Sequence, residues 1–89
     1  MSSITLAFSS NGVKTLDELH AGTRAVIVEV TGANSARTDR LLSLGVTPGA
    51  RVTVLQTFPG VVFMCDQTEL AVEWGIARLV YVRTQEEDR

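Results

Sequence analysis

The sequence predicts a mainly β fold: a small barrel of about five short strands with one inserted α-helix and a short helical turn near the N-terminus. Two observations lead to this prediction. Short runs of alternating apolar residues recur between turn residues, which is typical of strands. Residues 38–49 then specify, in order, a helix, its stop and a type II turn. Strands this short are too small for a layered sandwich, so we expect them to close edge to edge.

Length and composition indicate one ordinary globular domain. The chain has 89 residues, of which 45% are hydrophobic and 20% charged. We expect residues 1–12 to be a weakly ordered leader or a short strand, residues 13–83 to form the domain, and residues 84–89 to be a charged tail. The net charge of -2 offers no basic surface to nucleic acid, and no apolar run could span a bilayer. A lone cysteine and the lack of a signal segment favour the cytoplasm.

The first elements follow from alternation and from a capping pattern. The possible leader strand alternates small or polar residues with Ile4, Leu6 and Phe8. Thr15 and Glu18 have the spacing of a capping box, which predicts a helical turn that buries Leu16 and Leu19. Valines alternate with other side chains over residues 24–30, which predicts a core strand.

A helix is predicted over residues 37–44, with Asn34 or Ser35 as its N-terminal cap. Gly45 stands where a left-handed C-terminal cap is required. Residues 47–49 then place proline and glycine at the two central positions of a type II turn. The rest of the chain predicts four more strands and a helical turn, in the order residues 51–55, 61–65, 69–73, a turn at 74–78, and 79–82. The short connection at residues 66–68 predicts that the second and third of these strands form a hairpin.

Four blocks of the sequence occur in the order found in a known family. They are Leu16 and Leu19 with Gly22, residues 40–46 with Pro48 and Gly49, residues 70–72, and residues 79–82. The second block, which reads Arg-Leu-Leu-Ser-Leu-Gly-Val and then Pro-Gly, is the most specific. Over residues 15–82 the chain resembles the FeoA family of ferrous iron transport accessory proteins, which are small SH3-like barrels of the cytoplasm.

The resemblance implies a regulator or adaptor of the membrane ferrous-iron permease FeoB, with the GTP-hydrolysing cytoplasmic domain of FeoB as the docking partner. It implies no reaction and no cofactor. The residues agree, because an enzyme would need convergent acid, base or nucleophile groups, and the chain has one histidine, one cysteine and no phosphate-binding loop. We expect His20 to be exposed at a helix end and Cys65 to be a small buried side chain.

A docking module needs an exposed apolar patch or an unpaired strand edge. One candidate is the outward side of the predicted helix, where Leu42 lies about 100° around from the inward residue Leu41. The other consists of Phe58, Val61 and Trp74, which are large apolar residues near turns. The alternative for Leu42 is packing under a neighbouring loop, and for the other three it is a place in the barrel core or its lid. The residues expected to bind a partner are Arg37, Arg40, Leu42, Val46 and Phe58.

The alternative function is a small divalent-metal sensor or carrier. Cys65, Asp66 and Glu69 flank the predicted hairpin turn and could in principle hold a divalent ion. Alternation along a strand, however, places Cys65 and Asp66 on opposite faces. We therefore expect no native metal ligands and favour the adaptor.

Overall fold

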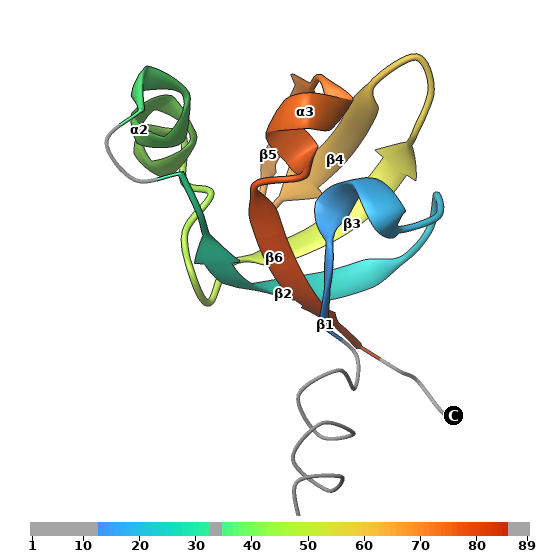
Figure 1. The fold of residues 1–89 in the computed structure, drawn as a ribbon. Coiled ribbons are helices and arrows are strands. Elements are labelled where there is room, and N and C mark those ends of the chain that lie inside the picture. The colour runs from blue at the N-terminus through green and yellow to red at the C-terminus, as the bar shows by residue number, and fades with distance from the viewer. Residues whose placement is uncertain (1–12, 33–34, 86–89) are drawn as a thin grey trace, which may run out of the picture.

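The computed structural model describes residues 13–32 and 35–85, and within these ranges it shows one sheet of six antiparallel strands (Figure 1). The expected leader, the candidate cap Asn34 and most of the charged tail lie outside the described residues. The elements along the chain are β1 (Val13–Thr15), η1 (Leu16–Glu18), β2 (Arg24–Val30), α2 (Ala36–Ser43), β3 (Arg51–Gln56), β4 (Val61–Cys65), β5 (Thr68–Val72), α3 (Trp74–Ala77) and β6 (Val80–Thr84). The mainly β prediction is confirmed, and β1 is the strand that it missed. No helix in the described ranges is long and apolar enough to cross a membrane.

The strands follow the order β1-β6-β2-β3-β4-β5, so β1 and β5 are the two end strands of the sheet. Edge-to-edge closure would pair these two strands, but the described ranges contain no such pairing. Instead, η1 and α3 lie against each other at one end of the curved sheet (Figure 1). β5 therefore pairs with β4 on one side and keeps a free edge on the other.

The curved sheet surrounds one apolar core. Its largest fully buried side chains are Leu16, Ile27, Val46, Val52, Val54, Val61, Phe63, Val80 and Val82. Leu16 and Leu19 of the N-terminal helical turn are buried, as predicted. β2 enters the core as predicted, through Ala25 and Ile27. Val28 follows Ile27 on the opposite face of the strand and is 39% exposed, and the pairing of β2 with β6 shifts by one residue at this point.

The predicted order of helix, cap and turn is present. Gly45 adopts a φ of 96° immediately after the last turn of α2, as a left-handed C-terminal cap requires. Gly49 has a φ of 95°, and the N–H of Ala50 donates to the carbonyl oxygen of Thr47 at 3.0 Å. These are the features of a type II turn, which feeds the chain directly into β3.

α2 is fastened to the end of β2 by the buried hydroxyl of Thr38. This hydroxyl lies 3.0 Å from the carbonyl oxygen of Thr31 and 2.8 Å from that of Gly32, and it donates toward both. The Ser35 hydroxyl donates to Thr38 Oγ1 and also caps the helix by accepting the Thr38 N–H at 3.0 Å. Gly32 permits the approach, since a Cβ there would lie 3.1 Å from Thr38 Oγ1.

Substitution of Gly45 tests the cap. A Cβ at Gly45 would meet no atom within 4 Å, so only the positive φ opposes a side chain there. We expect Gly45→Ala to lower the free energy of unfolding by about 1 kcal/mol in urea denaturation. Gly75 in α3 is equally open but has no positive φ, so Gly75→Ala is the matched control and should leave stability unchanged or raised. Equal losses in both variants would contradict the cap assignment.

Substitution of Thr38 tests the attachment of α2. Thr38→Val keeps the shape of the side chain but removes the hydroxyl, so we expect a loss of about 1–3 kcal/mol of unfolding free energy. The hydroxyl of Thr53 forms no hydrogen bond to the described residues, and Thr53→Val on β3 should change stability by less than about 0.5 kcal/mol. The same denaturation measurement checks both, and a Thr38→Val protein as stable as the wild type would be inconsistent with this role.

Candidate functional site

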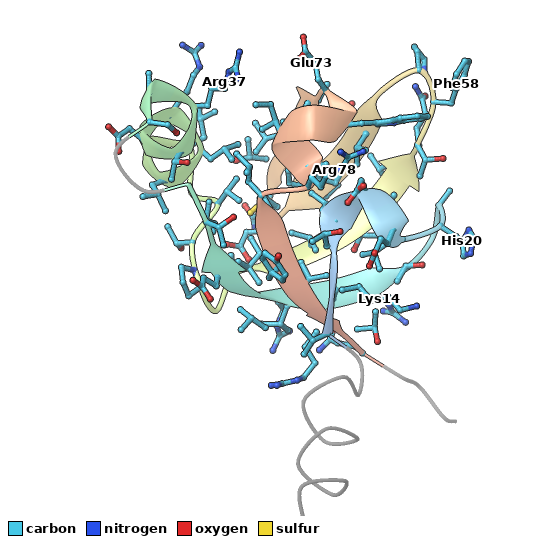
Figure 2. The ribbon with its side chains drawn as sticks, viewed as in Figure 1. Lys14, His20, Arg37, Phe58, Glu73 and Arg78 are labelled. Carbon is cyan, nitrogen blue, oxygen red and sulfur yellow. The ribbon has the colours of Figure 1, made fainter. Side chains whose placement is uncertain are left out.

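A groove of about 260 Å³ lies between α2 and the free edge of β5 and continues to the start of α3. Figure 2 shows Arg37 on α2 and Glu73 beside α3 at the same end of the molecule, on the two sides of this groove. The lining residues are Arg37, Arg40, Leu41, Leu44, Leu70, Ala71, Val72, Glu73 and Ile76. We call this surface the α2–β5 groove.

One face of α2 forms the first wall of the groove. The helix residues Arg37, Arg40 and Leu41 and the C-cap residue Leu44 have the i, i+3, i+4, i+7 spacing of a single helical face. Leu41 is buried, whereas both arginines are exposed. The one ion pair within the described ranges joins Arg78 to Asp17 elsewhere, so neither arginine of α2 pairs with a described carboxylate.

The edge strand β5 forms the second wall. The residues that flank the hairpin turn face each other and form the closing hydrogen-bonded pair. Because bonded and non-bonded positions alternate in an antiparallel pair, Leu70 and Val72 bond to β4. The backbone N–H and C=O groups of Glu69 and Ala71 therefore point toward the free edge. The half-buried side chains of Leu70 and Val72 pack against the core and give this wall an apolar surface.

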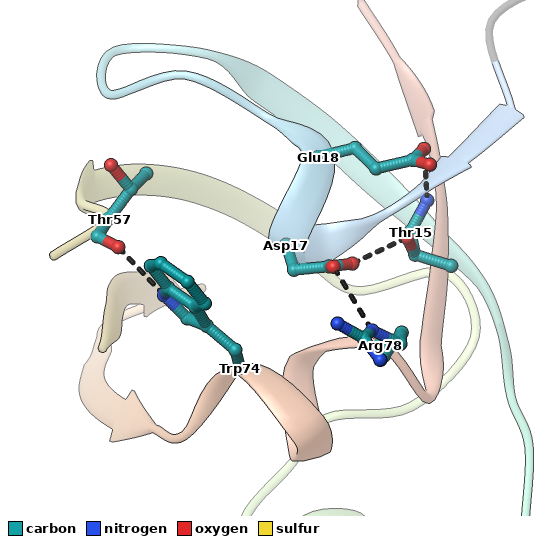
Figure 3. A network of polar contacts seen from close by, with 6 residues as sticks. All are labelled: Thr15, Asp17, Glu18, Thr57, Trp74 and Arg78. Carbon is teal, nitrogen blue, oxygen red and sulfur yellow. Dashed lines mark hydrogen bonds and ion pairs between the residues drawn. The ribbon is translucent and has the colours of Figure 1, made fainter. Parts of the chain in front are cut away.

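An exposed aromatic pair lies beyond the far end of β5. Phe58 is 74% exposed and Trp74 is 46% exposed, and their ring centroids are 6.3 Å apart. The Trp74 indole donates to the carbonyl oxygen of Thr57 at 2.8 Å, which fixes the ring (Figure 3). Val72 and Glu73 line both the α2–β5 groove and a shallow depression beside Trp74. The aromatic pair and the groove are thus parts of one continuous surface along β5.

A polar network supports the base of α3 near this pair (Figure 3). The Thr15 hydroxyl donates to the Asp17 carboxylate, which also accepts from Arg78 Nε at 3.4 Å. The Glu18 carboxylate accepts the Thr15 N–H at 3.2 Å, as the predicted capping box requires. The contact between Asp17 and Arg78 joins η1 to the C-terminal end of α3, the helix that begins at Trp74, whereas the contact with Thr15 lies within the N-terminal segment.

The five expected contact residues do not form one patch. Arg37 and Arg40 lie together in the groove, and Phe58 lies at the aromatic end of the same surface. Leu42 is 39% exposed but does not line the groove. Val46 is 0% exposed, so its expected place on the outward side is wrong. The chain reverses at Gly45, and this reversal directs the Val46 side chain into the core.

Cys65 is a core residue, as its apolar run predicted. It is 3% exposed, and its thiol donates to the carbonyl oxygen of Gly45 at 3.4 Å. Burial, with a smaller contribution from the negative charge of Asp66, raises the pKa of the Cys65 thiol. Asp66 lies outside the core and accepts the Arg51 N–H at 3.3 Å. Within the described ranges, no three side chains of the metal-ligating types gather in one place.

The sequence did not reveal the β5 side of the groove, because closure of the barrel would have covered that edge. One signal was available. Glu69 near the start of the strand and Glu73 just after its end carry charges, which is a common protection of an exposed edge. The helical spacing of Arg37, Arg40, Leu41 and Leu44 could likewise have identified the wall formed by α2.

Comparison with known proteins identifies the family. A family model described as the FeoA domain matches residues 14–84. A solved iron uptake regulatory protein (FeoA) is 29% identical, with a TM-score of 0.75, over 82% of this chain and 99% of that one. FeoA from Chlorobium tepidum is 29% identical, with a TM-score of 0.74, over 84% of this chain and 73% of that one.

A third relative is FeoA from Stenotrophomonas maltophilia, which was solved with zinc and is described as a prokaryotic SH3 domain protein. It is 31% identical, with a TM-score of 0.70, over 76% of this chain and 87% of that one. No curated protein sequence matches the chain. These similarities confirm the predicted SH3-like fold. Since the family model covers most of the chain, this protein belongs to the FeoA family, which is associated with ferrous iron transport.

Proposed function

We propose that this protein is a cytoplasmic accessory protein of ferrous iron uptake that binds the GTP-hydrolysing domain of the permease FeoB. The partner contacts the α2–β5 groove and the adjoining aromatic pair. The observation that carries the proposal is an apolar groove with two exposed arginines that pair with no described carboxylate, in a chain of the FeoA family.

The composition of the surface supports protein binding. Arginine and aromatic residues dominate the energetics of protein interfaces. Here Arg37 and Arg40 line the groove beside β5, and Trp74, with Phe58 next to it, lies just past the end of that strand. The Stenotrophomonas maltophilia relative is described as a protein that could act as a bacterial ferrous iron transport activating factor. A role in controlling transport agrees with that description.

In the proposed role the protein acts by binding and carries out no reaction. Cys65 is the one thiol of the chain, and its burial and raised pKa favour the unreactive protonated form. Binding changes the partner only if the two conformations of the permease domain differ in their affinity for this chain. The difference between those two binding free energies sets how far the equilibrium between the two conformations shifts.

The geometry also favours the adaptor over the metal sensor. A sensor built on Cys65 and Asp66 needs both side chains on one surface. The Cys65 thiol instead points into the core toward Gly45, and Asp66 faces β3 from outside. The zinc of the Stenotrophomonas maltophilia structure therefore gives no reason to assign a metal to these two residues.

The double variant Arg37→Glu/Arg40→Glu tests the docking surface. Reversing both charges should weaken binding to the purified cytoplasmic domain of FeoB by about tenfold or more, measured by isothermal titration calorimetry. Phe58→Ala should weaken binding in the same direction, because it removes an exposed aromatic group from the end of the same surface.

Leu42→Arg is the matched comparison, because Leu42 is exposed on α2 but lies outside the groove. We expect this variant to bind within about twofold of the wild type. A loss confined to Leu42→Arg would place the contact on the other face of α2. Equal weak binding by all variants, or none by the wild type, would count against the proposed function.

A further inference from the structure

The geometry points to a specific mode of docking: the partner enters the α2–β5 groove as an extended segment that adds a strand to β5. This segment has apolar side chains alternating with carboxylates. The inference rests on the proposed function and names the structural element of FeoB that binding requires. It follows from the backbone of β5, the apolar walls of the groove and the charges of α2.

The outer edge of β5 presents backbone groups that a further strand could bind. The N–H and C=O groups of Glu69 and Ala71 point away from β4, toward the free edge of the sheet, and Ala71 lines the groove. An added strand would pair with these groups and gain main-chain hydrogen bonds, as in other complexes formed at an exposed sheet edge. A helix has already used its own backbone groups, so a helical partner would leave this edge without main-chain partners.

Apolar side chains line both walls of the groove. Leu41 and Leu44 face the edge from α2, and Leu70 and Ile76 face it from the barrel side. Successive side chains of a strand alternate between its two faces. An added strand can therefore place every second side chain against this apolar surface. Its remaining side chains point to the opposite face, so they need not be apolar.

The wall formed by α2 carries two positive charges. Arg37 and Arg40 are exposed along the groove and pair with no described carboxylate. Arginine binds carboxylates through paired N–H donors, so acidic residues of the added strand are the complementary groups. This charge pattern selects an acidic and apolar segment over a basic one.

The same edge is poorly suited to a second copy of this chain. In an antiparallel pair of two β5 strands centred on Ala71, Glu69 of each copy would lie opposite Glu73 of the other. Like charges directly opposite each other destabilise a strand pair. The two glutamates thus disfavour self-association and leave the edge available to a different chain.

Ala71→Pro tests the strand addition. The Ala71 N–H points to the free edge, so proline there removes an outward donor and spares the hydrogen bonds to β4. We expect binding to the cytoplasmic domain of FeoB to weaken by about tenfold or more in calorimetry, with the thermal unfolding midpoint retained. The control variant Ala71→Val keeps the N–H and should bind within about threefold of the wild type.

Hydrogen exchange of the wild-type chain gives a second measurement that needs no variant. The amides of Glu69 and Ala71 should exchange more slowly once the FeoB domain is bound, while amides on the outer face of α2 should not change. If Ala71→Pro fails to fold, this protection alone decides the question.

The outcomes separate the two proposals. Binding that survives Ala71→Pro, or binding without protection at Glu69 and Ala71, overturns strand addition and leaves the proposed function intact. No binding of the FeoB domain by the wild type overturns both. A wild-type dimer in sedimentation that Ala71→Pro abolishes would assign the edge to self-association and also overturn the inference.

Discussion

The shape of the candidate site depends on one buried hydroxyl. Thr38 and Leu41 are the two buried residues of α2, and only Thr38 bonds the helix to the end of β2. The Thr38 contacts to Thr31 and Gly32 set where the helix begins, and Gly45 sets where the chain turns back toward the barrel. Between these two points α2 runs beside the edge of β5, and the groove is the space left between the helix and the strand.

Local rules predicted most of the fold because the relevant signals lie within a few residues of one another. The capping box at Thr15, the stop at Gly45 and the turn before β3 are each decided by backbone geometry and short-range hydrogen bonds. Alternation predicted the strands for the same reason. β1 was missed because its three residues are too few to show a period, and its pairing with β6 joins opposite ends of the chain.

The candidate site was harder to predict because it depends on which strand ends the sheet. Arg37, Arg40 and Phe58 were identified from their residue types, but their common surface arises only because β5 has a free edge. Val46 shows the opposite error. Its sequence position next to an exposed helix suggested the surface, whereas the reversal at Gly45 turns the side chain inward. Sheet order is a long-range property, and alternation within single strands carries no information about it.

Trp74 is the single tryptophan of the chain, and this gives its position a practical consequence. The indole is half exposed, is fixed by its bond to Thr57 and adjoins the strand edge at Val72 and Glu73. The emission of an indole shifts to shorter wavelengths when bulk water around it is replaced by less mobile groups. The molecule therefore carries an intrinsic optical reporter at this corner, and occupation of the corner by another chain would register in the fluorescence spectrum without any label.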